Sequence, residues 1–506
     1  MNNNDIKKKF VTIQKRLKGF WPTIASLNNE PHTIIVVPSL SLDPKELNKI
    51  HGIVHYEERF LFMLMLLRQP NCEIIFVSSQ QIHPYIIDYY LQNLPGIPYS
   101  HAKKRLKLIA AYDNSSIPLT QKILDRPGLI KRIKRKVRDP KSAYLSTFVT
   151  TPLERELAVK LNVALYGTDP ELSYIGTKSG CRKIFKKLKV NCPPGYEDIH
   201  NKGDLTRAVY NLFKANPDLK KVLVKLNDSF SGEGNAFVSR PKNENVTLKS
   251  VGESLKKIKF QSKSETASSY MKSLKTMGGI AEEVIETKEI ISPSVQLRIT
   301  PFGKVELLST HDQILGGRGH QVYLGCKFPA DVRYRNRIQL DSLKIGQELA
   351  KKGVIGRLSI DYIILYKMGG DEESIFAIEI NLRKGGTTHP FLTLDFLVSG
   401  TYDPESGEYT SGAGAKKYYI SSDNVQHEDY KGILPDDLFE ISALENVYYS
   451  NVTETGVVLH LIGALSEFGK VGITCIGDSM LQAENYFEKM VDILNREAAK
   501  NKPSNL

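Results

Sequence analysis

Residues 376–382 carry two oxygen-bearing side chains at a spacing that suits a metal ion. Glu379 and Asn381 alternate with Ile378 and Ile380, so in a strand we expect the isoleucines on one face and the carboxylate and carboxamide on the other. Such oxygen ligands suit Mg²⁺, which usually takes one or two protein carboxylates together with phosphate oxygens. Taken alone, this segment is explained about as well by a surface hairpin with ordinary charges.

A further carboxylate lies in the apolar segment just upstream. Asp361 interrupts the run 358–365, and a buried carboxylate needs a partner. Beyond Asn381 a Gly-Gly turn carries Arg383 and Lys384, two cations that suit phosphate. The combination of the two strands favours a site for magnesium and a nucleotide over a surface hairpin.

Two lysines elsewhere in the chain lie where a phosphate chain could bind. Lys225 falls on the polar face of a predicted strand at 221–226, which is followed by a Gly- and Ser-rich loop at 227–235. Backbone N–H groups of such a loop can fold over phosphates. Lys178 opens a predicted helix at 178–188, where free N–H groups favour an anion. The loop is not a Walker loop, and a plain hairpin and a solvent-facing lysine are the common alternatives.

Three further strands are predicted between the loop and the carboxylate strands, at 279–286, 292–299 and 305–310. The first leaves two carboxylates at a strand-to-loop transition. The last ends in a His-Asp-Gln run at 311–313 that is able to face a cleft, although a His-Asp pair is more often a structural hydrogen bond than a catalytic dyad. No nucleophile lies nearby in the sequence to change that preference.

The N-terminal part predicts an open α/β domain. Short β-branched runs at 33–39 and 73–79 flank a helix at 56–68, and this order indicates a βαβ unit with a parallel sheet. A Gly-x-Gly-x-x-Gly fingerprint is absent after the first strand, so a dinucleotide site is not supported. The C-terminal part predicts a long loop or linker at 401–415, strands at 456–462 and 471–476, and an amphipathic helix at 479–499.

The bulk composition is that of a soluble globular protein. The chain has 506 residues, 41% of them hydrophobic and 25% charged, which is enough for two to four domains. The longest apolar run, 60–67, is far shorter than a membrane span, and the polar N-terminus does not resemble a secretory signal. Five scattered cysteines form no Cys-x-x-Cys pair, so we expect a reducing cytoplasm and neither disulfides nor zinc.

The formal net charge of +13 leaves several partners open, among them nucleic acid, acidic lipid and phosphate. Much of the excess lies in the basic run 131–138, which is more simply read as a solvated helix face. A nucleic-acid binder using this run would show salt-dependent retention, and the lack of interleaved aromatic residues disfavours it.

The order of these parts resembles the ATP-grasp superfamily: a lysine at a helix start, a strand lysine before a Gly/Ser loop, a Glu-Glu-apolar hinge, an Asp strand and a Glu-x-Asn-x-Arg strand. More narrowly, the runs SPSVQLRI, STHDQIL, GCKFPA, EINLRKGGTTHP and TGVVLHLIGALSEFGKVG resemble the pheganomycin-type peptide ligases. The resemblance covers nearly the whole chain. It implies an α/β pre-ATP-grasp domain with an open parallel sheet at 1–172, an ATP-grasp domain of two α+β subdomains at 173–400, a linker at 401–440 and a small α+β C-terminal domain at 441–506.

The resemblance also implies a set of site residues. Those that would contact ATP are Lys178, Lys225, Ser229, Ser231, Gly232, Gly234, Glu282, Val284 and Ile285, with Ser294 or Gln296 near the position of a ribose contact. Among them, Glu282 would accept from the adenine amino group, and Val284 and Ile285 would lie at the hinge beside the adenine. Those that would bind magnesium, expected as two ions, are Asp361, Glu379 and Asn381. Arg357 and Arg383 would steady the transferred phosphoryl group and the acyl phosphate. The substrate candidates are Arg298, His311, Asp312, Arg318, His320 and His389.

The implied reaction joins a carboxylate and an amine, such as amino acids or peptides, through an acyl phosphate, with release of ADP and phosphate. The main alternative is a catalytically silent nucleotide-binding scaffold or regulatory protein, and the presence of the carboxylates and of both lysines disfavours it. We expect no membrane partner, nucleic acid is disfavoured, and a homo-oligomer is compatible with the sequence.

Overall fold

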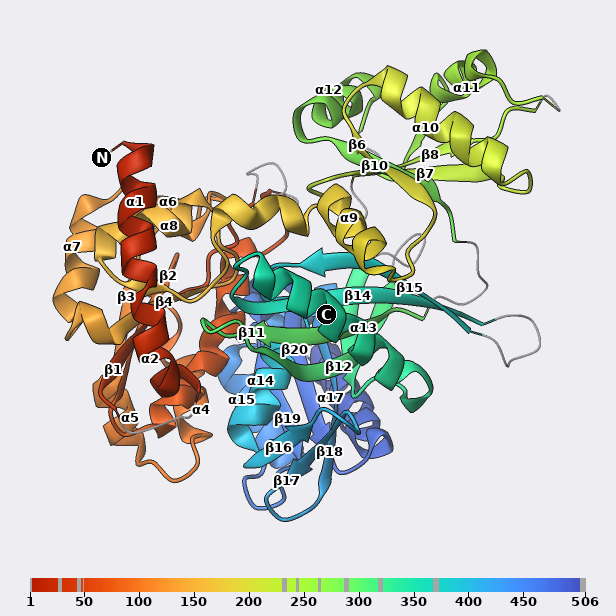
Figure 1. Cartoon of the computed structure of the whole chain (residues 1–506). Coiled ribbons are helices and arrows are strands. Elements are labelled where there is room, and N and C mark those ends of the chain that lie inside the picture. The colour runs from red at the N-terminus through yellow and green to blue at the C-terminus, as the bar shows by residue number, and fades with distance from the viewer. Residues whose placement is uncertain are drawn as a thin grey trace, which may run out of the picture.

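The computed structural model describes residues 2–25, 30–42, 47–48, 50–229, 234–242, 245–262, 265–285, 291–316, 322–366 and 373–500. Three β-sheets organise them (Figure 1). The first lies in the red and orange part of the chain, the second in the yellow-green lobe that projects at the upper right, and the third runs from green to blue. The mixed α/β architecture agrees with the fold class predicted from the sequence.

The first sheet is parallel, with the strand order β3-β2-β1-β4-β5. Its strands are β1 His32–Val37, β2 Cys72–Ser78, β3 Leu106–Ala110, β4 Ala143–Thr147 and β5 Ala164–Leu165. The helices around it are α1 Asn3–Gln14, α2 Arg16–Ala25, the 3₁₀ segment Ile53–Arg68, α4 Pro84–Gln92, α5 Tyr99–Arg105, α6 Leu119–Leu124, α7 Pro127–Lys136 and α8 Pro152–Leu161.

Burial on both faces explains why these strands are continuous apolar runs. All six residues of β1 are buried, as expected for a central parallel strand with helices on either side. Local signals set the helix ends: α8 begins with a capping box formed by Thr151 and Glu154, and Asn162 ends it in the left-handed region at a φ of 61°. The basic run forms much of α7, an amphipathic surface helix.

The second sheet has the order β6-β10-β7-β8-β9. Helices α10 to α12 cover the side of this sheet that faces away from the rest of the protein (Figure 1). Val222, Val224 and Leu226 of β7 pack toward these helices, which leaves Leu223 and Lys225 on the opposite face. The elements are β6 Gly195–Ile199, β7 Lys221–Leu226, β8 Asn235–Ser239, β9 Lys259–Phe260, β10 Gly279–Glu283, α10 Lys202–Ala215, α11 Leu248–Leu255 and α12 Ala267–Met277.

The third sheet is the largest and follows the order β15-β14-β11-β12-β13-β18-β17-β16, with β19 and β20 joined to it through β18. Its strands are β11 Pro293–Ile299, β12 Val305–Gly316, β13 Val322–Phe328, β14 Gly356–Tyr366, β15 Glu373–Asn381, β16 Gly400–Asp403, β17 Glu408–Ser411, β18 Lys416–Gln426, β19 Gly456–His460 and β20 Lys470–Gly477. The helices that accompany it are α9 Lys178–Leu188, α13 Val332–Lys351, α14 Thr388–Leu397, α15 Pro435–Leu444, α16 Leu465–Phe468 and α17 Met480–Lys500.

Most of the linker expected at 401–440 is instead part of this sheet, up to residue 426, and the helix α15 begins at Pro435. Its Gly- and Ser-rich stretch forms the turns of the β16, β17 and β18 meander, and β18 pairs with β13 on one side and β20 on the other. Because β18 lies between two neighbours, the C-terminal strands continue the central sheet and do not form a sheet of their own. The expectation failed because Gly, Ser and charge mark tight turns as well as linkers.

The expected alternation of Ile378 and Ile380 is also wrong. A β-bulge interrupts the β14/β15 ladder, where Asp361 pairs with Glu379 but Tyr362 pairs with Ala377, leaving Ile378 as the extra residue. Ile380 packs in the core, whereas Ile378 lines a cavity together with Glu379. The bulge therefore turns an apolar side chain toward the polar face of the sheet.

The N-terminal unit is joined to the C-terminal strands by buried polar contacts as well as by a shared apolar core. Arg59 pairs with Asp423 of β18 at 3.0 Å, and Glu58 accepts a hydrogen bond from the backbone N–H of Gly463 at 2.9 Å. Glu58 and Arg59 thus connect the 3₁₀ segment of the N-terminal unit to the C-terminal part of the chain. In the part of the chain that the structure describes, no helix has the length and apolar character needed to span a membrane.

Candidate nucleotide and metal site

A cavity of about 260 Å³ lies between the second sheet and the carboxylate strands of the third. Its polar lining includes Lys178, Lys225, Glu282, Asp361 and Glu379, five residues singled out from the sequence. The apolar lining comes from both sheets and comprises Leu223, Phe237, Ile280, Leu315, Tyr362 and Ile363. A cavity with apolar side chains from two sheets and two lysines in its lining can accommodate a purine base and its phosphates.

The two lysines reach the cavity from different elements. Lys178, the first residue of α9, lies with its Nζ 3.4 Å from Glu379 Oε1 and 3.1 Å from the backbone carbonyl of Ser229, to which it donates. Lys225 of β7 lies with its Nζ 2.6 Å from Glu282 Oε1. Both ammonium groups are held by carboxylates near the place where phosphates would add negative charge.

The start of α9 is fixed by contacts with the surrounding elements. Thr177 caps the helix by accepting from the Gly180 N–H at 3.1 Å, and Asn227 accepts from the Ser179 N–H at 2.9 Å. The Ile380 N–H donates to Cys181 Sγ at 3.1 Å, which ties the helix to β15. These contacts hold Lys178 in one position between the end of β7 and strand β15.

Glu282 is neutralised by a residue that sequence reasoning missed. Arg182 of α9 donates from Nη1 to Glu282 Oε2 at 2.7 Å and from Nε to Glu197 Oε1 at 2.8 Å. The predicted role of Glu282, accepting from the adenine amino group, therefore competes with two cations already bound to it. The signal that could have identified Arg182 is its place beside Cys181 on the apolar stripe of an amphipathic helix.

The metal-ligand candidates face one another across β14 and β15. Asp361 accepts from Ser294 Oγ at 2.7 Å and from Asn381 Nδ2 at 2.9 Å, and its Cα partner in the ladder is Glu379. Burial, and then the negative charge of Glu379, raises the pKa of Asp361 to about 6. Burial opposes ionisation of Glu379 too, but Lys178, Arg383 and Lys225 outweigh it and lower the pKa of that carboxyl.

This donor set fits magnesium. It offers two carboxylates and a carboxamide on adjacent strands, and a divalent cation would relieve the mutual repulsion that raises the pKa of Asp361. Oxygen donors without a thiolate or imidazole among them disfavour zinc.

Two segments complete the cavity. Val284 and Ile285, expected at the adenine hinge, line it next to Glu283. Ser229 also lines it, and Gly234 lies so close to Ser229 that an added Cβ would lie 2.4 Å from the serine Cβ. Ser231 and Gly232, expected between them, lie outside the described residues, as do the substrate candidates Arg318 and His320.

Three expected site residues have structural roles instead. Gln296, a candidate for the ribose contact, donates from Nε2 to the Thr387 carbonyl at 2.7 Å and accepts from Thr388 Oγ1, so it anchors the Gly-Gly turn. His311 is fully buried and bonded to Tyr419 at 2.6 Å, and burial lowers its pKa to about 3. Asp312 accepts from the Tyr334 hydroxyl at 2.6 Å at the start of α13. Strand β12 continues to Gly316, so residues 311 and 312 remain within the sheet.

His389 also lies outside the nucleotide cavity. Its Nε2 is 2.8 Å from Asp423 Oδ1 and 3.2 Å from His460 Nε2, in a buried cluster next to Arg59. Burial lowers the pKa of His389 to about 4. The cluster joins α14 to the C-terminal strands.

The two arginines expected to steady phosphate are placed differently. Arg383 is close enough to Glu379 and Asp361 to influence both carboxyl groups, and its guanidinium lies over the Phe148 ring at 5.4 Å. Arg357 lines a second cavity together with Arg298 and does not line the nucleotide cavity.

Comparisons with known proteins agree with this geometry. The pattern of the IQCH-like ATP-grasp family matches residues 170–267 and 247–405, and that of the PGM1 C-terminal domain matches residues 437–489. L-propargylglycine–L-glutamate ligase from Streptantibioticus cattleyicolor is 26% identical over 473 residues, which cover 90% of this chain and 92% of that protein. IQ motif-containing protein H from Danio rerio is 24% identical over 408 residues, 72% of this chain but only 38% of that protein.

Solved structures share the fold at low sequence identity. Biotin carboxylase from Campylobacter jejuni, solved with β-γ-ATP, has a TM-score of 0.54 at 12% identity and covers 93% of this chain and 96% of its own. N5-carboxyaminoimidazole ribonucleotide synthetase, solved with ADP, has a TM-score of 0.51 at 11% identity and covers 92% of this chain and 97% of its own. The family match therefore assigns residues 170–405, which include the second sheet and the carboxylate strands of the third, to the ATP-grasp family.

Proposed function

We propose that the protein is an ATP-dependent carboxylate–amine ligase that forms a peptide or amide bond. The observation that carries this proposal is the convergence of Lys178 and Lys225 on the same cavity as Asp361 and Glu379. A relative that covers 90% of the chain is a ligase by name and joins two amino acids, which supports the same reaction class here. Small carboxylates and amines, such as amino acids or peptides, are therefore the proposed substrates.

The nucleotide would lie with its base between the apolar side chains of the two sheets and its phosphates toward the lysines. Val284 and Ile285 would offer backbone groups to the adenine edge. Lys178 and Lys225 would pair with phosphate oxygens, each exchanging part of its present contact with Glu379 or Glu282. Glu282 then acts chiefly to position Lys225, and its own negative charge stays paired with Arg182.

Asp361, Glu379 and Asn381 would hold magnesium, with two ions as part of the proposal. When bound, magnesium would neutralise charge on the transferring phosphoryl group. Ser294 orients Asp361 through its hydroxyl, and Asn381 orients it from the neighbouring strand. Arg383 supplies a further positive charge beside the same carboxylates.

The proposed chemistry has two steps. A carboxylate oxygen of the first substrate attacks the γ-phosphorus of ATP, the bond to the β-γ bridging oxygen breaks, and ADP leaves as an acyl phosphate forms. The amine nitrogen of the second substrate then attacks the acyl carbon, phosphate leaves with the bonding electrons, and the nitrogen loses one proton. Positioning and charge neutralisation carry most of the rate in phosphoryl transfer, so no protein nucleophile is required.

Substitution of Glu379 tests the proposal. Glu379→Ala removes a ligand from the metal set, and we expect ADP release that depends on both a carboxylate and an amine to fall by more than about 100-fold. Glu253→Ala, which removes an exposed carboxylate on α11, is the matched control and should retain the wild-type rate. A wild-type rate in the Glu379 variant would contradict the proposal. Binding of ATP without amine-dependent turnover in the wild type would instead favour a silent nucleotide-binding scaffold.

A further inference from the structure

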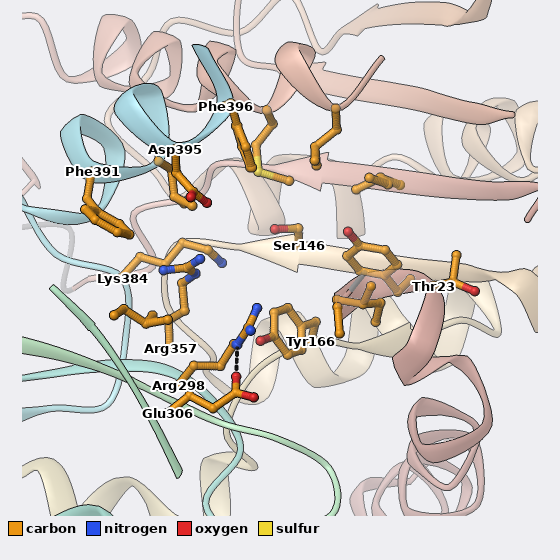
Figure 2. A pocket seen from close by; sticks show the side chains of 18 of the residues that line it. Thr23, Ser146, Tyr166, Arg298, Glu306, Arg357, Lys384, Phe391, Asp395 and Phe396 are labelled. Atoms are coloured by element: carbon orange, nitrogen blue, oxygen red, sulfur yellow. Dashed lines mark hydrogen bonds and ion pairs between the residues drawn. The ribbon is translucent and has the colours of Figure 1, made fainter. Parts of the chain in front are cut away.

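A second cavity, of about 430 Å³, lies between the first sheet and the third (Figure 2). Strands β1 and β4 and the end of α2 form one wall, and β11, β12 and β14 form the other. Helix α14 and Lys384 complete the lining. Its volume falls within the range of small-molecule sites, and none of its lining residues lines the nucleotide cavity.

Arg357 of β14 is a half-buried cation without an ion-pair partner among the described residues of this cavity. Its Nη1 atom is buried and makes no hydrogen bond, and no ion pair to its guanidinium occurs among the described residues. Burial, and then the nearby charge of Arg298, lowers the pKa of Arg357 to about 10. A buried guanidinium normally requires a carboxylate or phosphate, and this one has neither from the described part of the chain.

The other charged residues near Arg357 are already engaged in contacts of their own. Arg298 donates from Nε to Glu306 Oε2 at 2.7 Å, the contact drawn as a dashed line in Figure 2, so the charge of Glu306 is already balanced. Lys384 donates to the Thr147 carbonyl, and burial followed by the charge of Arg357 lowers its pKa to about 7. None of these contacts therefore balances the charge of Arg357.

Asp395 of α14 offers the opposite charge across the cavity. Figure 2 shows its carboxylate and the Arg357 guanidinium approaching the space from opposite sides. Burial raises the pKa of Asp395, while the charges of Arg357, Arg298 and Arg68 and a hydrogen bond with Tyr409 act in the opposite direction. No ion pair of Asp395 occurs among the described residues. One cation and one anion without an ion-pair partner thus face the same space.

The rest of the lining is largely apolar and aromatic. Tyr144 and Tyr166 lie on the side of the first sheet, and Phe391 and Phe396 project from α14. Met63 and Leu66 of the 3₁₀ segment add aliphatic surface. Such a lining favours a ligand with an apolar or aromatic side chain.

We propose that this cavity binds an α-amino acid with an apolar or aromatic side chain, whose carboxylate pairs with Arg357 and whose ammonium group lies beside Asp395. The zwitterion matches the two unpaired charges, and a planar guanidinium can bind a carboxylate through two parallel hydrogen bonds. The binding site does not depend on the ligase proposal. Its use as a substrate site does, and then it rests on the function proposed above.

The position of Arg357 sets how far the ligand lies from the metal carboxylates. Arg357 and Asp361 lie on the same face of β14, four residues and therefore about 13 Å apart. Gln296, anchored to the turn at 384–388, lies between them in the adjacent strand. A carboxylate held by Arg357 is thus remote from the metal carboxylates, and the ammonium group on the same α-carbon is about as remote, so a ligand bound in this pose lies apart from the proposed phosphoryl-transfer site.

Calorimetric titration of the full-length protein with L-phenylalanine and L-leucine tests the site. Two matched ligands lack one charge each: L-phenylalaninamide lacks the carboxylate, and 3-phenylpropionate lacks the ammonium group. The variants are Arg357→Met and Asp395→Asn, with Arg132→Met on the exposed face of α7 as the control for loss of an arginine charge. Arg357→Met removes an unpaired buried charge, so it should fold, and its thermal midpoint in the absence of ligand should equal or exceed that of the wild type.

We expect at least one of the two amino acids to bind the wild type and the Arg132 variant equally, and the Arg357 and Asp395 variants about 30-fold more weakly or worse. Equal binding of L-phenylalaninamide, an unchanged dissociation constant in Arg357→Met, or no binding of either amino acid at millimolar concentration would overturn the proposal. Because Glu379→Ala leaves this cavity intact, binding should persist in that variant even if the ligase proposal fails. Mass spectrometry of the product separates a consumed substrate from an effector, and both results support the site.

Discussion

Lys225 Nζ and Glu282 Oε1 lie 2.6 Å apart, joining the neighbouring strands β7 and β10 of the second sheet at the edge of the cavity. Arg182 holds the other oxygen of the same carboxylate at 2.7 Å. Lys225, the lysine proposed to bind phosphate, is therefore placed by a carboxylate that also pairs with a second, buried cation, Arg182. Three residues from α9, β7 and β10 act as one unit.

Glu282→Gln should disrupt this unit. The substitution leaves Arg182 and Lys225 without the charge that balances them, and breaking a buried pair in this way costs about 3–5 kcal/mol of unfolding free energy. We expect a lower thermal midpoint and a raised KM for ATP. Glu253→Gln on α11 is the control, because its contact with Lys256 is exposed and contributes little. An unchanged KM for ATP in a folded Glu282 variant would show that Lys225 is positioned without this carboxylate.

Metal-free stability should depend on pH through Asp361. Its pKa of about 6 exceeds the ordinary value, so between about pH 4 and 6 the native state binds more protons than the unfolded state, and this group's contribution to stability falls as pH rises through that window. Relative to the wild type, Asp361→Asn should therefore be more stable at pH 7 than at pH 4.5 when magnesium is absent. Thermal midpoints measured across this range, with the exposed Asp218→Asn as control, check it. The prediction would be contradicted if the difference in thermal midpoint between Asp361→Asn and the wild type were the same at every pH.

Magnesium should remove the advantage in stability that Asp361→Asn has over the wild type at pH 7. Bound metal favours the ionised carboxylates, so at pH 7 the wild type should gain stability on addition of magnesium and ATP, whereas Asp361→Asn should gain little. Turnover in the wild type should fall as the pH drops below about 6, because protonation of Asp361 then competes with the metal. A turnover rate that stays level from pH 7 to pH 5 would argue that Asp361 is not a metal ligand.

The glycine at the start of α9 provides a steric test. A Cβ added to Gly180 would lie 2.0 Å from the carbonyl oxygen of Tyr174, so Gly180→Ala must displace the helix start that carries Lys178. We expect a loss of about 1–3 kcal/mol in unfolding free energy together with weaker ATP binding. Gly252→Ala in α11, where an added Cβ meets nothing within 4 Å, is the matched control and should stabilise by up to about 1 kcal/mol. Equal stability and ATP affinity in the two variants would contradict the tight approach.

The contact between Arg59 and Asp423 can be tested as the link between the N-terminal unit and the third sheet. Arg59→Met leaves Asp423 with only two histidine neighbours, and we expect a loss of about 3–5 kcal/mol, measured as a lower denaturant midpoint. Arg132→Met on the surface of α7 should leave the midpoint unchanged. A small effect in the Arg59 variant would mean that the shared apolar core alone holds the two parts together.

The elements that carry the motifs could be predicted from sequence because their signals are local. The β14 segment alternates clearly around Asp361, and α9 begins at a capping threonine and ends at residue 188, as expected. The parallel order of the first sheet follows from short apolar runs separated by helices. These patterns need only neighbours in the chain to be recognised.

What the sequence missed depends on partners distant in the chain. Strand β18 reads as a polar segment, and it becomes a sheet strand because β13 and β20 lie on either side of it. The bulge at Ile378 depends on its pairing with β14 and leaves no mark in the local periodicity. Arg182 could not be recognised from sequence because its partner Glu282 is distant in the chain. Arg357 could not be recognised because only the folded structure shows that its Nη1 atom lacks a hydrogen bond.

The place of β18 between β13 and β20 limits how this chain can be cut and recombined. A truncated chain ending near residue 436 would lose β20, and the backbone groups along one edge of β18 would then be open to pairing with another chain. Residues 437–489 match a family pattern of their own, but because β20 pairs with β18 they cannot be exchanged as an independent domain. Chimeras between relatives should therefore join within the surface loops of the first sheet, where the central ladder remains whole.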